Sequence, residues 1–253
     1  MSDLTIEKRR KKIKFKHHPN LGNKVLSVLA GRSGSGKTYL LFKILTTPDY
    51  LDFESVIIFT RTGYQPIYQC LYHGFNNGLS KTAIASIFKI YEDSDIEEDI
   101  EELCIEAAKN KDLLAPKNQQ VKVLLTDDTS SMNDPSKLDK QLKHCCVFDD
   151  CVNDKDQTVQ NNYYISGRHS NCSVFYLTQN LYAINTTIRR NANIFILFEL
   201  DHRSLTEILK IFPSNMRTSF KQSAENLWAE PFNYVTYNQD LPKNKRIIVD
   251  LFA

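Results

Sequence analysis

Short apolar runs alternate with stretches of helical apolar spacing along most of the chain. The runs have the length of strands buried on both faces, and they lie at 25–30, 56–59, 121–125, 145–148, 173–177 and 194–198. This alternation predicts an α/β fold with a mainly parallel central sheet flanked by helices. Two last runs, 234–237 and 246–251, lie on either side of Pro242 and are expected to add antiparallel edge strands.

The longest helical pattern lies in the first half of the chain. Residues 64–110 are expected to be mostly helical, with breaks near Gly74 and Gly78. A polar helix is expected between the runs at 145–148 and 173–177, and the segment from Arg203 predicts one further helix. The pattern contains no internal repeat, so we expect one domain rather than an array.

A glycine-rich turn joins the first apolar run to a helix predicted over 37–45. Its residues fit the P-loop pattern G-x-x-x-x-G-K-[ST], and they are Gly31, Arg32, Ser33, Gly34, Ser35, Gly36, Lys37 and Thr38. Chance produces this pattern in roughly one chain in a hundred of this length. A chance match need not follow an apolar strand or precede a helix. Because this motif does both, its context predicts a phosphate-binding loop.

Each fixed position of the loop has a chemical reason. Glycines let backbone N–H groups turn around the β-phosphate, because no Cβ obstructs the turn or the ligand. The helix that follows presents its positive amino-terminal end to the same phosphates. We expect Lys37 to place its charge between the β- and γ-phosphates and the Thr38 hydroxyl to bind Mg²⁺. The predicted ligands are Mg²⁺ and ATP, or another nucleoside triphosphate.

A P-loop enzyme also needs a carboxylate at the end of a neighbouring strand. Two apolar runs end in paired aspartates, Asp127-Asp128 and Asp149-Asp150. We favour the second pair, because the next run ends in Gln179 and would place that side chain at the same sheet edge. Asp149 is then expected to hold Mg²⁺ through water, Asp150 to polarise the attacking water, and Gln179 to sense the γ-phosphate. The first pair is interpreted as a surface turn.

An arginine ahead of the run at 173–177 is a candidate for a role in a neighbouring subunit. Arg168 could reach that subunit's γ-phosphate and stabilise charge in the transition state. Arg189 and Arg190 are competing candidates. The alternative for all three is surface pairing or contact with nucleic acid.

Composition excludes some classes of protein but adds little to the predicted structure. The hydrophobic and charged fractions, 42% and 25%, are those of ordinary globular proteins. No apolar run approaches the roughly 20 residues of a membrane span, and the start of the chain lacks a secretory signal, so we expect an intracellular protein without a membrane partner. No C-x-x-C pair occurs, so the six cysteines are expected to be reduced, buried and structural rather than metal ligands.

Charge is nearly balanced at a formal +2, but its distribution is uneven. Residues 1–20 form a basic arm that could neutralise phosphates, act as a nuclear-import signal or be a solvated tail. Residues 21–253 are predicted to form a single P-loop ATPase domain. The acidic stretch 92–102 predicts one amphipathic helix, because its apolar positions keep helical spacing: Ile96, Ile100 and Leu103.

The ordered set of motifs resembles the genome-packaging ATPases of large DNA viruses and their virophage relatives, the poxvirus-type branch of the FtsK/HerA superfamily. The resemblance covers about residues 23–200. It is carried by the P-loop, Val147-Phe148-Asp149-Asp150, Gly167-Arg168-His169, Tyr176-Leu177-Thr178-Gln179 and Ile188-Arg189-Arg190-Asn191. One position departs from the pattern, because many members carry glutamate where this chain has Asp150.

The resemblance implies a ring-forming homo-oligomer that couples ATP hydrolysis to threading double-stranded DNA into a preformed capsid. It further implies a capsid or portal-vertex partner and a viral assembly site in the host cytoplasm or nucleus. Arg168 would act in trans, and Gln179 would be the sensor. The shorter side chain of Asp150 could hold the attacking water less well than glutamate.

Other functions of a P-loop domain remain open on the sequence. A nucleoside or nucleotide kinase also combines a P-loop with an α/β fold, but it needs an acceptor pocket and usually an arginine-bearing lid. A GTPase is disfavoured, because Asn153-Asp154-Lys155-Asp156 has its lysine misplaced for the guanine-reading N-K-x-D. A nucleotide-binding assembly scaffold with little turnover is the non-enzymatic alternative.

Overall fold

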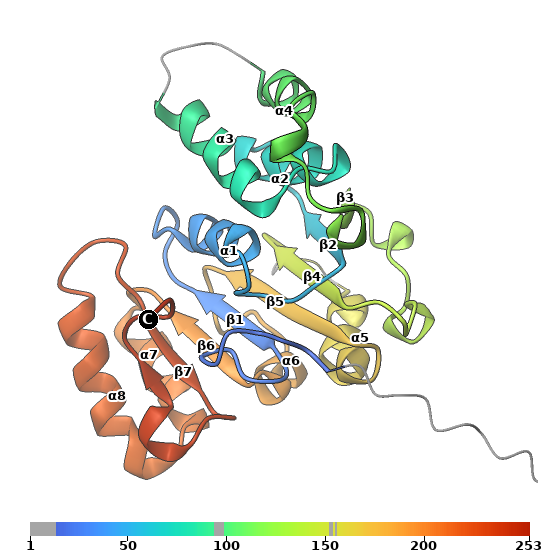
Figure 1. The fold of residues 1–253 in the computed structure, drawn as a ribbon. Helices are drawn as coiled ribbons and strands as arrows, with labels where there is room; N and C mark the ends of the chain where they lie inside the picture. Colours follow the sequence, from blue (N-terminus) through green and yellow to red (C-terminus); the bar gives the residue numbers. More distant parts are fainter. Residues whose placement is uncertain (1–13, 94–98, 152–153, 155) are drawn as a thin grey trace, which may run out of the picture.

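The computed structural model describes residues 14–93, 99–151, 154 and 156–253, and its centre is a β-sheet (Figure 1). In this part of the chain, eight strands run in the order β3-β2-β4-β5-β1-β6-β7-β8. Their bounds are β1 Leu26–Ala30, β2 Ser55–Thr60, β3 Lys122–Thr126, β4 His144–Asp149, β5 Cys172–Thr178, β6 Ile194–Leu197, β7 Val235–Asn238 and β8 Ile247–Ile248. The first six strands in that order, from β3 through β6, run parallel to one another. Strand β7 pairs antiparallel with β6, and β8 pairs antiparallel with β7. The predicted sheet, including its antiparallel edge, is confirmed.

Helices cover both faces of the sheet. One face carries α1 Lys37–Thr46, α2 Pro66–Asn76, α3 Lys81–Asp93 and α4 Ile100–Ala108. The other carries α5 Thr158–Ser166, α6 Thr186–Asn191, α7 His202–Ile211 and α8 Ser214–Leu227. Short 3₁₀ turns connect these elements: η1 Lys111–Leu113, η2 Lys117–Gln119, η3 Thr129–Ser131, η4 Pro135–Lys137, η5 Gly167–His169 and η6 Lys243–Lys245.

The core consists of one apolar layer on each face of the sheet. Every residue of β1 is buried, and successive side chains alternate between the layers, with Leu29 on the α1 side and Val28 on the α5 side. This alternation follows from the two-residue period of a strand. It explains why the central strands are continuous apolar runs, since both faces of a parallel sheet are covered.

The helical region after β2 differs from its prediction at one glycine. The break near Gly78 is confirmed, because Gly78 has φ +75° between α2 and α3. Gly74 is not a break, since it lies inside α2. A Cβ at Gly74 would lie 2.6 Å from Cγ1 of Ile84. This glycine is therefore required by the close approach of α3, a tertiary cause that local sequence does not reveal.

Two helix boundaries also correct the sequence predictions. A single helix across 92–102 is wrong, because Asp99 is extended, with ψ 128°, and its side chain caps the first turn of α4; Ile96 lies outside the described residues. The single helix expected from Arg203 is two helices. Phe212, with ψ 147°, ends α7 directly before Pro213, since a residue that precedes proline disfavours the helical region.

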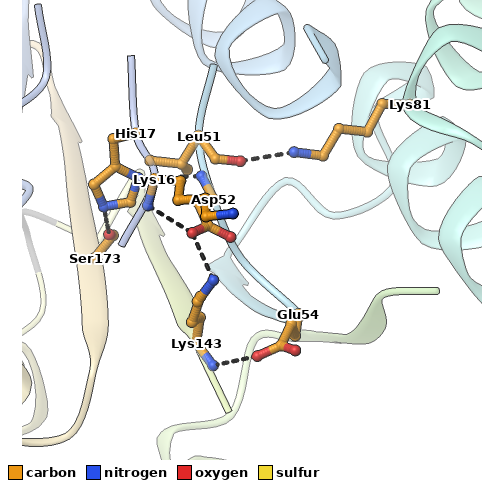
Figure 2. Close-up of polar contacts among 8 residues, drawn as sticks. All are labelled: Lys16, His17, Leu51, Asp52, Glu54, Lys81, Lys143 and Ser173. Atoms are coloured by element: carbon orange, nitrogen blue, oxygen red, sulfur yellow. Dashed lines mark hydrogen bonds and ion pairs between the residues drawn. The ribbon is translucent and has the colours of Figure 1, made fainter. Parts of the chain in front are cut away.

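The described part of the basic arm lies against the amino-terminal edge of the sheet, whereas Lys8 to Lys12 fall outside the described residues. Figure 2 shows the contacts around Asp52. Its carboxylate accepts hydrogen bonds from the backbone N–H of Lys16 at 2.7 Å and from Nζ of Lys143 at 2.7 Å. The backbone N–H of Asp52 donates to Nδ1 of His17 at 3.1 Å, and Nε2 of His17 lies 3.4 Å from Oγ of Ser173. These contacts tie the end of the arm to β5 and to the segments that precede β2 and β4.

The anchoring histidine predicts a pH-dependent stability. Burial lowers the pKa of His17 to about 4 from 6.5, opposed by Asp52 and assisted by Lys143 and Lys81. Between these values the unfolded chain binds a proton that the folded chain does not, so stability decreases as pH falls through this window. We expect a loss of about 1–3 kcal/mol. Urea unfolding at pH about 7 and about 4.5 measures it, and a His17→Asn variant that keeps the same pH slope would contradict the assignment.

Candidate nucleotide-binding site

The P-loop follows β1 directly at the carboxyl-terminal edge of the sheet. Its entrance is fixed by backbone bonds to both neighbouring strands, from Gly31 N to Thr178 O at 3.2 Å and from Phe198 N to Ala30 O at 2.9 Å. A Cβ at Gly31 would lie 2.6 Å from Cβ of Phe198. Gly36 has φ +94° at the start of α1, a conformation that side chains rarely adopt. The glycines of the motif are therefore required by geometry.

Lys37 folds back over the loop that precedes it. Its Nζ donates to the carbonyl oxygens of Gly31 at 2.9 Å and Arg32 at 2.7 Å. The side chain is only 8% exposed. Burial lowers the pKa of Lys37, and the nearby carboxylate of Asp149 opposes this shift. The loop thus encloses one buried cation at the amino-terminal end of a helix, which is the charge arrangement that binds phosphate.

The paired aspartates at the end of β4 have different environments. Asp149 is partly buried, and its carboxylate accepts a hydrogen bond from the hydroxyl of Tyr68. Burial raises the pKa of Asp149, the negative charge of Asp150 adds to the rise, and Tyr68 and Lys37 oppose it. Asp150 is exposed and has φ +54°. Two adjacent carboxylates are thus presented differently, one held in place and one open to solvent.

A cleft of about 580 Å³ brings most of the predicted site together. Parallel register explains the gathering, because Ala30 pairs with Thr178 and Thr60 pairs with Asp149, so that strand ends meet at one edge. The cleft is lined by the following predicted residues: Ser33, Gly34, Ser35, Gly36, Lys37, Thr38, Asp149, Asp150 and Gln179. Of the remaining predicted loop residues, Gly31 is buried beneath the loop, and Arg32 lies on its outer side, where Nη2 is 3.6 Å from Glu199.

Comparison with known proteins identifies the fold. No protein-family model matches the sequence, and no curated protein matches it significantly. The genome packaging NTPase B204 from Sulfolobus turreted icosahedral virus 2, in complex with AMP, aligns at a TM-score of 0.50 over 90% of this chain and 97% of that chain, with 16% identity. Its complex with sulfate gives 0.51 over 89% and 94%, with 14% identity. The chain has a P-loop NTPase fold.

The P-loop NTPase fold agrees with the family resemblance of the sequence motifs. The side-chain oxygens of the predicted ligand residues also suit a magnesium ion. The hydroxyl of Tyr68 donates a hydrogen bond to the carboxylate of Asp149 and lies close to the side chain of Thr38. These two predicted ligand residues therefore share one buried neighbour. Mg²⁺ prefers oxygen ligands and usually takes one or two from the protein, with phosphates and water completing the shell. The residues present fit that ion.

The candidate arginine Arg168 lies away from this cleft. It belongs to η5, ahead of β5, whereas Gln179 follows the opposite end of that strand. A strand of seven residues separates them by roughly 20 Å. Arg168 is exposed, and its Nη2 donates to the carbonyl of Asn191 at 2.9 Å, beside the end of α6 that carries Arg189 and Arg190. The three candidate arginines therefore lie near one another and do not line their own subunit's cleft.

Sequence reasoning missed several residues in and beside the cleft, among them Tyr68, Thr62 and Gln65. Tyr68, on α2, is fully buried and orients Asp149, while Thr62 and Gln65 line the cleft from the β2–α2 connection. Tyr68 occurs among apolar residues at helical spacing, where it resembles any core aromatic residue. Asp127, the end of the rejected pair, lies beside β3 and outside the cleft lining, and Asp128 accepts a hydrogen bond from Ser130 N at 2.8 Å within a surface turn.

The predicted burial of the cysteines is confirmed. All six are free and buried, and burial raises the pKa of the thiols of Cys145 and Cys146. Among the described residues, no group of three or more histidine, cysteine or acidic side chains could hold a metal ion. None of the described helices has the length and hydropathy needed to cross a bilayer.

Proposed function

We propose that this protein is an ATPase whose catalytic residues are Lys37, Asp150 and Gln179. The observation that supports it is the convergence of the P-loop, the paired acids and the glutamine on one cleft. They come from the ends of β1, β4 and β5, which are adjacent in the sheet. Open α/β sheets bind ligands at this edge, where strand order reverses.

Each residue has a role that follows from its surroundings. Lys37 exchanges its bonds to loop carbonyls for the oxygens of the β- and γ-phosphates and keeps its position. Thr38 and Asp149 would hold Mg²⁺, which would neutralise charge on the phosphates. Asp150, exposed in the cleft, accepts a proton from the attacking water. Gln179 donates a hydrogen bond to the γ-phosphate and transmits the presence of that phosphate to β5.

The fate of the γ-phosphate tests this proposal against the two alternatives. Incubation with ATP is expected to release inorganic phosphate at a rate that does not depend on added nucleoside or nucleotide. A kinase would transfer the phosphate to such an acceptor instead. Tight nucleotide binding without turnover would favour an assembly scaffold.

We further propose that hydrolysis drives double-stranded viral DNA into a preformed capsid. The shared fold with a genome packaging NTPase supports this function, as do the sequence motifs. The functional unit would be a homo-oligomeric ring docked on a capsid or portal vertex at an intracellular assembly site. DNA binding is expected to be salt-sensitive and largely independent of sequence, because the phosphate backbone supplies the contacts.

The ring proposal makes a specific prediction about Arg168. In a ring, this arginine would act on the nucleotide of the adjacent subunit, so Arg168→Ala is expected to lower kcat by roughly 10³-fold with unchanged oligomer size. Steady-state hydrolysis and analytical ultracentrifugation measure the two quantities. Full activity with intact oligomers would remove Arg168 from the site, and losses confined to Arg189→Ala or Arg190→Ala would assign the role there.

A further inference from the structure

A second cleft of about 440 Å³ lies on the other side of the P-loop. Its lining joins the loop to the end of β6 and to residues 228–233, which connect α8 to β7. Ser33, Gly34 and Ser35 line both clefts. A ligand held by the backbone of these residues can therefore extend into either one.

Phe232 is the unusual residue of this second cleft. It is 70% exposed and has φ +66°, a combination that is uncommon for a bulky side chain. Its ring lies beside the P-loop, since Cδ1 is 3.6 Å from the position that a Cβ would take on Gly36. The side chain thus lies next to the loop, while most of it is exposed in the cleft.

The connection that carries Phe232 is fixed at its two ends to the last residue of β6 and to the residue that follows it. Nε1 of Trp228 donates to the carbonyl of Leu197 at 3.0 Å. The ring of Tyr234 packs on Phe198 at a centroid distance of 5.3 Å. These contacts hold the backbone of the segment beside the loop. A phenylalanine side chain has only two rotatable side-chain bonds, so little entropy is lost when a flat ligand covers it.

The order of the strands gives the direction of a bound nucleotide. Asp149 and Gln179 lie on the β4 and β5 side of β1 and mark the position of the γ-phosphate. The α-phosphate then points towards the opposite side, which is the side of β6 and β7. The second cleft lies there, because Phe198 follows β6 and residues 228–233 precede β7.

We propose that Phe232 is the stacking platform for the base of the bound nucleoside triphosphate, an inference that rests on the nucleotide-binding function proposed above. Base and ribose occupy the second cleft, while the phosphates lie in the first. Glu230 and Asn233, also in the lining, offer an acceptor and a donor to the edge of the base. Stacking needs only the flat face of the base, so the platform tolerates different bases.

Binding of ATP compared with binding of tripolyphosphate tests the platform, with calorimetry as the measurement. Phe232→Asn removes the ring and keeps a residue that tolerates positive φ. It is expected to weaken ATP binding by roughly tenfold or more, as for the loss of a base–aromatic stack, and to leave tripolyphosphate affinity within about twofold. Phe232→Tyr is expected to retain ATP affinity within about threefold. Ile90→Ala, which truncates an exposed apolar side chain on α3, should leave the affinities for ATP and tripolyphosphate unchanged.

Three results would overturn the platform. The first is ATP affinity that survives Phe232→Asn. The second is an equal loss of ATP and tripolyphosphate, which would make Phe232 a support of the loop. The third is a wild-type protein that binds tripolyphosphate as tightly as ATP. None of these readouts involves hydrolysis or DNA, so a protein that fails as a DNA motor can still show the expected selectivity for ATP.

Discussion

Replacing Lys37 by alanine is expected to lower ATP hydrolysis by about 10²–10³-fold and to weaken ATP binding. The ammonium group is the buried cation of the P-loop, and the phosphates would face only backbone N–H groups without it. Steady-state hydrolysis and calorimetric titration with ATP measure both effects.

Lys43→Ala is the matched control, because it removes the same charge from the same helix at an exposed position. Lys43 extends over the ring of Phe252, with Nζ 4.1 Å from its centroid, and away from the cleft lining. The hydrolysis rate of the Lys43→Ala variant should remain close to that of the wild type. Equal rates for Lys37→Ala and the wild type would exclude the P-loop from catalysis.

Replacing Asp150 by asparagine is expected to lower turnover by about 10²–10⁴-fold with ATP affinity nearly unchanged. The amide cannot accept the proton of the attacking water, yet it fills the same volume and tolerates the positive φ of this position. A loss in kcat without a rise in the dissociation constant separates this role from that of Lys37.

Asp127→Asn is the matched control for the acid. Asp127 also follows a strand of the sheet, but β3 is separated from β4 by β2, and Asp127 does not line the nucleotide cleft. Its activity should be that of the wild type. An equal loss in both variants, or a loss confined to Asp127→Asn, would transfer the catalytic acid to β3.

The P-loop and the paired acids were predictable because parallel strands impose simple geometry. A motif that begins where one strand ends must lie beside the ends of its neighbours, so Asp149 and Gln179 needed only their positions after apolar runs. Local chemistry carried the rest, since glycines at positive φ and a lysine after them have few other uses. The fold followed from the same runs.

Tyr68 and Phe232 could not be predicted because their roles depend on tertiary contacts. Tyr68 has the sequence pattern of a core residue, and only the tertiary placement of α2 brings its hydroxyl to Asp149 at the end of β4. Phe232 lies about 200 residues beyond the loop that it adjoins in space. Gly74 was misinterpreted for the same reason, since the helix that approaches it lies on the far side of a turn.

The most direct test of the motor is ATP hydrolysis by the purified protein with and without double-stranded DNA. The account predicts a rate that rises when DNA is added, falls back as salt weakens DNA binding, and disappears in both Lys37→Ala and Asp150→Asn. Hydrolysis that is indifferent to DNA at every salt concentration would contradict it and leave an ATPase that does not move DNA.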